Sequence, residues 1–431
     1  MSICQTASVA KSASIRLAAV KSDVKNGALA QICRALQAKK AEIVSANQKD
    51  LAAAEKNYLA GPLLKRLKFD EKKLDAVCAG LESLIKLEEP VGKIVTATEL
   101  DEGLKLYKVS CPIGVIGIIF ESRPDALVQI SSLCLKSGNA VLLKGGSEAE
   151  NTNRLLAEVI TQAGQKAGLP EGWLQLLHTR QDVAEMLTMD EYIDLLIPRG
   201  SNEFVRYIMN NTNIAVLGHA DGICHVYVDG DADIEMAVDI TVDSKCQYVA
   251  VCNAAETLLV DEKIAEDFLP KVKTALEAKG VELRGCEKTI SLIKVKPAVE
   301  EDWSIEYLDY ILSVKVVGGL DEAVEHINRY GSGHTDTIVT ANKEKAEQFM
   351  ELVDSANVFV NCSTRFSDGF RYGLGAEVGI STNKIHARGP VGLEGLVIYK
   401  WKLLGTGQIV ADYASGKKSF THKKISKDCD S

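Results

Sequence analysis

The chain has 431 residues, of which 46% are hydrophobic and 25% are charged, and its formal net charge is -9. This length suggests two or three domains, and the acidic balance with dispersed lysines argues against a nucleic-acid-binding protein. The 11 cysteines show no CxxC pair and no Cys/His pair at zinc-ligand spacing, and we find no long apolar run or signal-like N-terminus, so we expect a cytoplasmic protein with reduced thiols, no metal site and no membrane span.

The first part of the chain has a helical pattern. Residues 8–90 are rich in Ala, Leu, Lys and Glu at helical spacing, which predicts a helical N-terminal region. Residues 106–110 then alternate between apolar and polar, as an exposed strand does, and could form half of a hairpin.

Apolar strands alternate with helices in the rest of the chain. The first group comprises expected strands at 114–120, 140–144 and 174–177 and helices at 126–135 and 151–167. A second group repeats this order, with strands at 257–260 and 314–317 and a helix at 265–279. Continuous apolar strands that alternate with helices are typical of a doubly wound parallel sheet, so we expect two α/β domains.

The usual Gly-x-Gly-x-x-Gly fingerprint follows none of these strands, so a dinucleotide site must be inferred otherwise. Lys144 ends an apolar strand, where it could pair with a ribose or a phosphate, although a solvated lysine that opens a turn is the simpler interpretation. In the loop 197–202, backbone amides near Gly200 and Ser201 could bind a pyrophosphate. An ordinary capped loop explains this segment equally well.

Cys252 stands just ahead of a small, apolar, strand-like run and is our candidate nucleophile. A cysteine thiolate can attack an activated carbonyl and hold the acyl group as a thioester. Buried structural cysteines are far more common than catalytic ones, so the local pattern leaves both interpretations open.

Longer motifs carry a family resemblance. The segments 112–117, 136–144 and 169–172 resemble the cofactor domain of the aldehyde dehydrogenase superfamily. Within that superfamily the chain resembles the gamma-glutamyl phosphate reductases, at residues 218–225, 317–338, 361–382 and 386–390. The resemblance extends over residues 5–415 and implies an aldehyde-dehydrogenase-like α/β fold, with two doubly wound α/β domains and a small oligomerisation hairpin.

The resemblance also implies an activity. Enzymes of this family use NADPH to reduce L-glutamyl 5-phosphate to L-glutamate 5-semialdehyde, with release of phosphate, in L-proline biosynthesis. Cys252 falls where the family carries its nucleophile, whereas we interpret Cys246 as structural or incidental. A thioester on Cys252 would accept a hydride, and backbone amides near Cys252 and Asn253 would hold the oxyanion.

Two departures from oxidative aldehyde dehydrogenases favour reduction. His219 stands where those enzymes carry the glutamate that activates water for thioester hydrolysis. Ser122 replaces their oxyanion asparagine, and Arg123 adds a charge suited to a phosphate or a carboxylate. We therefore expect all three residues in the substrate site. The alternative for Arg123 is an internal salt bridge with Glu121 or Asp125.

Further candidates follow from the same comparison. Glu306 lies where the superfamily holds the nicotinamide ribose. Ser363 and Arg365 lie on a polar loop suited to the phosphate or the α-carboxylate of the substrate, although such residues often only satisfy their own turn. At the adenosine end of the cofactor, Ser147 could help to bind a 2′-phosphate, whereas an inward-pointing Glu148 would repel it.

The resemblance finally implies a domain organisation. We expect an NADP-binding domain at residues 1–240 with a hairpin near 95–110, and a catalytic domain with Cys252 at 241–370. Residues 371–431 would return to the cofactor domain, add an oligomerisation strand at 395–404, and end in a flexible tail from residue 415. Edge strands of this kind favour a homodimer or tetramer. A separate glutamate 5-kinase must make the acyl phosphate, and its transient contact is a further candidate interaction.

Overall fold

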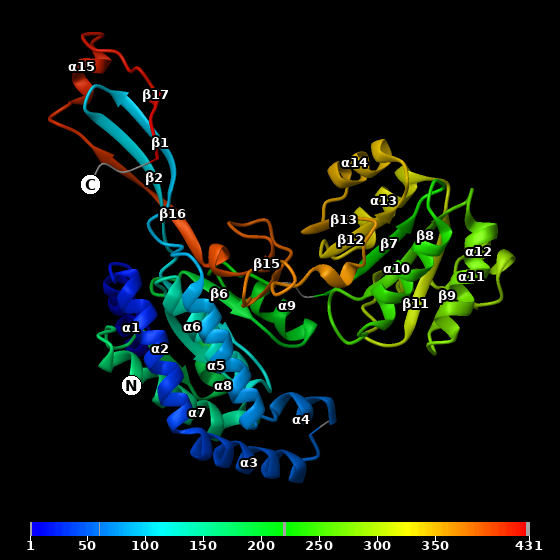
Figure 1. Cartoon of the computed structure of the whole chain (residues 1–431), viewed down its shortest axis with the longest axis horizontal. Helices are drawn as coiled ribbons and strands as arrows, with labels where there is room; N and C mark the ends of the chain where they lie inside the picture. Colours follow the sequence, from blue (N-terminus) through cyan, green and yellow to red (C-terminus); the bar gives the residue numbers. More distant parts are fainter. Residues whose placement is uncertain (1, 60, 219–220, 428–431) are drawn as a thin grey trace.

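The computed structural model describes residues 2–59, 61–218 and 221–427, and it forms two α/β lobes with a small projecting sheet (Figure 1). The first lobe contains α1 to α9, and the second lobe contains β7 to β13 with their helices. Within the described part of the chain, no helix is both long and apolar enough to cross a membrane. The same residues contain no cluster of His, Cys, Asp and Glu side chains that could hold a metal ion.

The helical N-terminal region is confirmed as a series of five helices, α1 (Ile3–Leu17), α2 (Ser22–Ala38), α3 (Lys40–Lys56), α4 (Gly61–Leu67) and α5 (Glu71–Lys86). Ser2 begins α1 with a reciprocal capping box, and the Asp70 side chain caps α5. These side-chain oxygens accept hydrogen bonds from backbone N–H groups that have no partner inside the helix, which determines where the helices begin.

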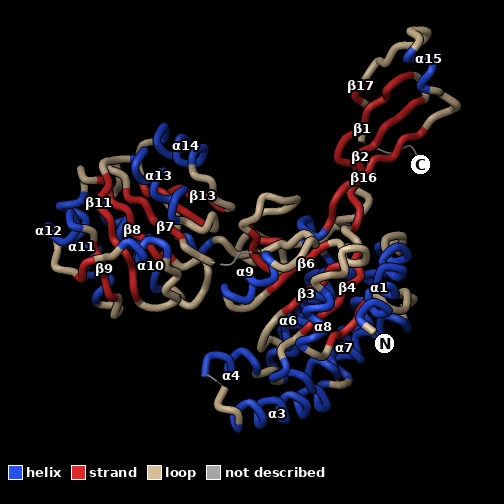
Figure 2. Tube along the Cα trace, turned by 180° about the vertical axis from the view of Figure 1, so that it is seen from behind, coloured by secondary structure: helices blue, strands red, loops and turns tan. Residues whose placement is uncertain are grey.

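The first lobe is built on a parallel sheet with the strand order β5-β4-β3-β6. Its elements are β3 (Val115–Ile119), α6 (Pro124–Lys136), β4 (Ala140–Lys144), α7 (Glu150–Lys166), β5 (Leu174–Leu177), α8 (Arg180–Met186), β6 (Leu195–Pro198) and α9 (Asn202–Asn210). Ile116 and Ile118 pack in the core formed with α2, α5, α6 and α7, whereas Val115 and Ile119 pack in the core on the side of α8. Both faces are covered (Figure 2), which explains the continuous apolar strands.

The second lobe contains a seven-stranded parallel sheet with the order β10-β9-β11-β8-β7-β12-β13. Its elements are β7 (Cys224–Val228), α10 (Ile234–Cys246), β8 (Ala255–Asp261), α11 (Ala265–Glu277), β9 (Glu282–Gly285), α12 (Glu287–Leu292), β10 (Lys296–Pro297), β11 (Ile311–Val317), α13 (Leu320–Tyr330), β12 (Thr335–Val339), α14 (Lys343–Leu352) and β13 (Asn357–Val360). Separate apolar cores lie under α10 and α11 and under α13 and α14. This is the second α/β unit that the sequence predicts.

The projecting sheet is antiparallel, with the order β16-β2-β1-β17. The predicted hairpin is confirmed as β1 (Ile94–Asp101) and β2 (Leu104–Pro112), and β16 (Val397–Leu404) pairs with β2 along its length. Part of the tail that we expected to be flexible is paired instead, because β17 (Lys423–Lys424) lies beside β1. The reason is Ile425, which packs on the apolar cluster of this sheet.

The chain after β13 returns to the first lobe. It contains β14 (Gly379–Ser381), β15 (Gly389–Val391) and α15 (Val410–Ala414). The Asn139 side chain donates to the carbonyl of Leu396 at 2.7 Å, and the Asn383 side chain donates to the carbonyl of Val216 at 2.8 Å. These amide contacts attach the segment after β13 to the first lobe.

Candidate active site

Cys252 lies on the turn between α10 and β8, and its backbone is held from two sides. The thiol of Cys224 donates a hydrogen bond to the Cys252 carbonyl at 3.2 Å, and the Thr364 hydroxyl donates to the Asn253 carbonyl at 2.7 Å. A Cβ atom on Gly222 would lie only 2.2 Å from the Cys252 carbonyl oxygen, so this close approach requires glycine. The turn therefore presents a partly buried thiol from a constrained backbone.

The backbone next to the thiol offers hydrogen-bond donors. The N–H groups of Cys252 and Asn253 donate no hydrogen bond to another described residue. The Asn253 side chain is engaged, because its Nδ2 donates to the Ser367 carbonyl at 2.7 Å. Unpaired N–H groups beside a nucleophile are the donors that a developing oxyanion needs. The predicted donors are therefore available in this geometry.

Ser363 and Arg365 lie close to the cysteine turn, on the short helical turn Thr364–Phe366. The Ser363 hydroxyl accepts a hydrogen bond from the Arg365 N–H at 3.2 Å, so it satisfies its own turn, as the alternative interpretation expected. The Nε of Arg365 donates to the Gln247 side chain at 2.9 Å. Burial, followed by the nearby Arg371 charge, lowers the pKa of Arg365 from its ordinary value.

Ser122 and Arg123 follow β3 at the carboxyl edge of the first sheet. Ser122 is buried and has a φ of 43°, a left-handed conformation that is unfavourable for a non-glycine residue. Its N–H and hydroxyl both donate to one Glu148 carboxylate oxygen, at 2.5 and 2.6 Å. Arg123 forms the internal ion pair with Asp125, at 3.2 Å. Both side chains thus have partners within the protein.

Arg199 and Glu377 are two charged residues of this site that the sequence analysis missed. The Arg199 N–H donates to the Ile119 carbonyl at 2.7 Å, which places Arg199 beside the end of β3. Burial lowers the pKa of Arg199, and Arg123 adds to this effect, while Glu377 and Cys252 oppose it. Burial also raises the pKa of Glu377. Arg199 precedes Gly200 directly, so the loop was identified but its arginine was not.

A hydrogen bond connects the two lobes beside these loops. Glu306, from the segment before β11, accepts from the Asn202 side chain at 2.7 Å, and Asn202 also donates to Asp221 at 2.9 Å. Asn202 begins α9, whose N-terminus is capped by the Ser201 hydroxyl. The structure thus brings Glu306 together with Gly200 and Ser201, as a shared cofactor role would require.

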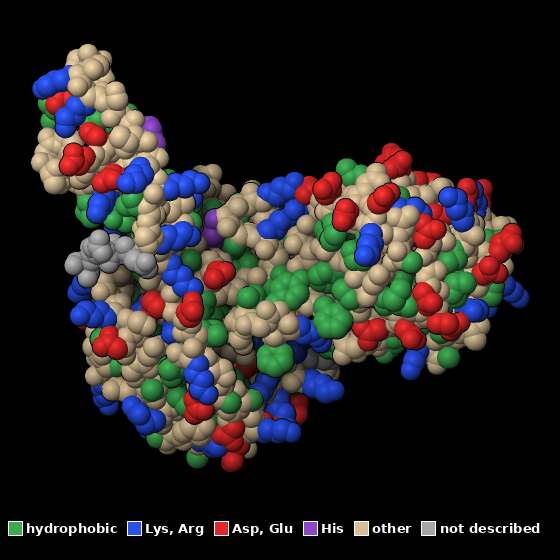
Figure 3. All heavy atoms as spheres, turned by 45° about the horizontal axis from the view of Figure 1, so that its top comes forward, with side chains coloured by type: hydrophobic (Ala, Val, Ile, Leu, Met, Phe, Trp, Pro, Cys, Tyr) green, Lys and Arg blue, Asp and Glu red, His purple; other side chains and the backbone are tan. Residues whose placement is uncertain are grey.

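His219 lies outside the described residues. Figure 3 shows basic side chains where the two lobes meet.

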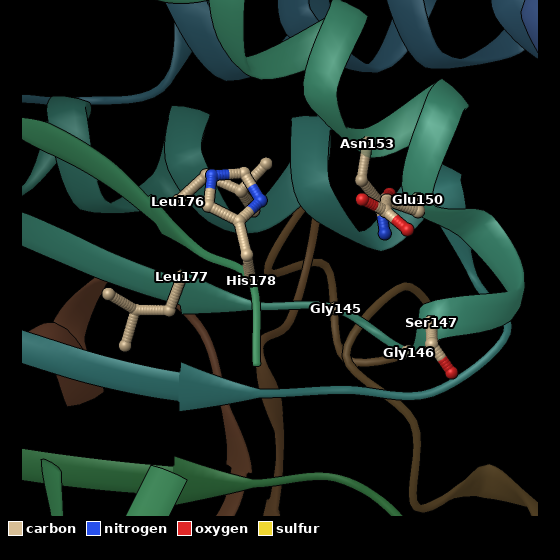
Figure 4. A pocket seen from close by; sticks show the side chains of 8 residues that line it. All are labelled: Gly145, Gly146, Ser147, Glu150, Asn153, Leu176, Leu177 and His178. Carbon is tan, nitrogen blue, oxygen red and sulfur yellow. The ribbon is translucent and has the colours of Figure 1, made fainter. Parts of the chain in front are cut away.

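A shallow pocket lies at the carboxyl ends of β4 and β5 (Figure 4). It is lined by Gly145, Gly146, Ser147, Glu150, Asn153, Leu176, Leu177 and His178. Asn153 is buried, and its Oδ1 has no hydrogen-bond partner. Lys144 is the last residue of β4, and its Nζ donates to the Gly145 carbonyl at 2.5 Å. Glu148 is not among the lining residues, because its carboxylate accepts from Ser122.

Lys245 and Glu256, one on each side of the cysteine turn, form a buried ion pair that the sequence analysis did not identify. The Lys245 Nζ lies 2.5 Å from Glu256 Oε2, and neither side chain is exposed. Burial raises the pKa of Glu256 to about 7, although Lys245 opposes this shift. Glu256 also accepts from the Leu308 N–H at 3.3 Å. The pair therefore connects the two ends of the cysteine segment with the segment that carries Glu306.

Comparison with known proteins gives consistent results. The aldehyde dehydrogenase family model matches residues 5–287. A gamma-glutamyl phosphate reductase of Acetivibrio thermocellus is 67% identical over 427 residues, which cover 99% of each chain. Another, from Pelotomaculum thermopropionicum, is 68% identical over 97% of this chain and 96% of its own length.

Solved structures agree with these sequence matches. The crystal structure of gamma-glutamyl phosphate reductase from Thermotoga maritima has a TM-score of 0.92 at 41% identity, covering 94% of this chain and 99% of that one. An acetylating aldehyde dehydrogenase from Geobacillus thermoglucosidasius has a TM-score of 0.63 at 16% identity, covering 94% of this chain and 97% of its own, which shows the shared fold alone.

We predict that the Lys245–Glu256 pair stabilises the protein above the pKa of Glu256. At about pH 8, Lys245→Met should lower the free energy of unfolding by about 1–2 kcal/mol more than it does at pH 6, because only the wild type then gains the attraction between Lys245 and an ionised Glu256. Below about pH 7 the difference from the wild type should level off, because Glu256 is then protonated in both proteins. Urea denaturation across this pH range measures it. Lys245→Met combined with Glu256→Leu should recover most of the loss, and additive losses would contradict the coupling.

Proposed function

Because the chain belongs to the gamma-glutamyl phosphate reductases, oxidoreductases of the aldehyde dehydrogenase family, we propose that it reduces L-glutamyl 5-phosphate to L-glutamate 5-semialdehyde with NADPH, in L-proline biosynthesis. The observation that carries this proposal is the cysteine turn. A partly buried thiol stands beside two N–H groups that have no described acceptor, at the junction where Glu306 of the second lobe contacts the first lobe.

The proposed reaction begins with attack by Cys252 on the acyl phosphate carbonyl. The N–H groups of Cys252 and Asn253 hold the negative oxygen, and the loss of phosphate leaves a thioester. When bound, NADPH supplies a hydride to this thioester. The same N–H groups then hold the second oxyanion, whose collapse frees the aldehyde and restores the thiolate. Arg123 and Arg365 favour an anionic substrate at the two sides of the turn.

The NADPH proposal is supported by the pocket at β4 and β5. The unpartnered Oδ1 of Asn153 can accept a hydrogen bond from a ribose hydroxyl. Lys144, Gly200 and Ser201 stand at the carboxyl ends of β4 and β6 in the same sheet, where a dinucleotide would bind, and Glu306 contacts the start of α9 through Asn202. Ser147 and His178 provide donors for a 2′-phosphate at the pocket rim. The Glu148 carboxylate, which would repel this phosphate, is engaged by Ser122 instead.

We further propose that the projecting sheet mediates a homo-oligomer, either a dimer or a tetramer. β16 forms one edge of this sheet, and it exposes Tyr399, Trp401 and Leu403 to at least half of their full extent. Exposed edge strands with large apolar side chains are rarely left unpaired. The same strand corresponds to the oligomerisation element expected from the sequence.

We predict that turnover depends on Cys252 and on phosphate. The reverse reaction, NADPH formation from glutamate 5-semialdehyde and NADP, should require inorganic phosphate in the wild type. Cys252→Ala should reduce its kcat by more than about 1000-fold, because the nucleophile is lost. Cys246→Ala is the matched control and should retain activity. Turnover that is indifferent to phosphate would instead indicate an oxidative aldehyde dehydrogenase.

We predict that His178 contributes to selection of NADP. His178→Ala should raise the dissociation constant of NADP about tenfold, the equivalent of about 1.4 kcal/mol, while binding of NAD should hardly change. Isothermal titration calorimetry with both cofactors measures this without turnover. Equal weakening of both cofactors would show that His178 only supports the pocket.

We predict that the outer face of β16 maintains the oligomer. Replacing Trp401 and Leu403 together by glutamate should shift the protein to smaller species, because like charges would replace apolar contacts. Sedimentation velocity measures the change. Ile15→Glu, which alters an exposed apolar side chain of α1, is the control and should leave the sedimentation coefficient unchanged. A wild-type monomer would refute the proposal outright.

A further inference from the structure

Four arginines stand around the cysteine turn, and they differ in their partners. Three of them are engaged within the protein: Arg123 with Asp125 at 3.2 Å, Arg365 with Gln247 at 2.9 Å, and Arg371 with the Arg365 carbonyl at 2.7 Å. The Arg199 guanidinium donates no hydrogen bond to another described residue, although Arg199 is half-buried. Arg199 is thus the exception in this group.

An unpartnered guanidinium in a poorly solvated position is energetically unfavourable. It carries five N–H donors and keeps its charge at any physiological pH. Leaving a buried charged donor without an acceptor costs more than leaving a neutral one. Such a group is therefore well suited to an incoming anion, which would supply both the missing charge and the missing acceptors.

The position of Arg199 indicates which part of the substrate is concerned. The Arg199 backbone is fixed beside the end of β3, and Asn202 of the same loop donates to Asp221, next to the Gly222 that touches the Cys252 backbone. The carbonyl carbon that Cys252 attacks carries the phosphate directly, whereas the α-carboxylate lies at the other end of the substrate. We therefore expect an anion held between this loop and Cys252 to be the phosphate. Arg365 belongs to the second lobe and remains for the carboxylate.

We propose that Arg199 binds the phosphoryl group of the acyl phosphate and stabilises it as it leaves. This inference rests on the function proposed above. The sulfur electron pair forms the new S–C bond, the C–O bond to phosphate breaks, and the departing oxygen takes its electron pair. The proton of the Cys252 thiol ends on the phosphate, so the products are the thioester and hydrogen phosphate. The planar fork of Arg199 matches two phosphate oxygens at once.

The reverse reaction tests this role, because inorganic phosphate is then a substrate with its own KM. Arg199→Gln should raise the KM for phosphate by about 10- to 100-fold, the effect of losing a charge-assisted bidentate contact. The KM for the semialdehyde and the dissociation constant of NADP should change by less than about twofold. Arg199→Lys should be intermediate, because it keeps the charge without the fork. Arg329→Gln, an exposed arginine of α13, is the control.

A second measurement does not depend on turnover. Inorganic phosphate should slow the alkylation of Cys252 by iodoacetamide in the wild type and in Arg329→Gln, but not in Arg199→Gln. A rise in the KM for the semialdehyde alone would overturn the proposal, since Arg199 would then bind the carboxylate. Unchanged constants in both Arg199 variants would overturn it as well. A wild type whose turnover is indifferent to phosphate would refute the proposed function itself, which is a different result.

Discussion

The close approach of Gly222 to Cys252 is the constraint on which the site depends. Parallel pairing of β7 with β8 places Cys224 beside Ala255, so the segments that precede the two strands must pass each other within contact distance. Only a glycine at position 222 leaves room for the Cys252 carbonyl, and the Cys224 thiol donates a hydrogen bond to that carbonyl. The sheet register therefore positions the Cys252 thiol and the adjacent N–H groups.

The charges around this turn are held in poorly solvated positions. Burial lowers the pKa of Arg199 and Arg365 and raises that of Glu256 and Glu377. The charged form of each side chain is therefore less favourable here than it is in water. In such surroundings a correctly placed charge acts more strongly on a ligand than it would at the surface. In the reaction proposed above, limited access of water would also protect the thioester from hydrolysis.

The sequence predicted the elements whose residues are almost continuously apolar, such as β3 and β4. It did not predict β12, because Thr335, Asp336 and Thr337 interrupt the apolar pattern. Their burial is possible because the Asp336 carboxylate accepts from the His225 backbone N–H at 2.8 Å, a contact between residues far apart in the chain. Arg199 was missed for a similar reason, since its importance lies in an absent partner, and neither contacts nor their absence can be read from local sequence.

The loop after β3 combines backbone strain with specific hydrogen bonding at Ser122. Ser122 adopts a left-handed conformation that costs a non-glycine residue about 1–2 kcal/mol, and its two hydrogen bonds to Glu148 offset part of that cost. Glycine would relieve the strain and keep the N–H bond to Glu148, but it would remove the hydroxyl bond. The serine therefore combines a strained backbone with a second hydrogen bond that fixes the Glu148 carboxylate at this loop.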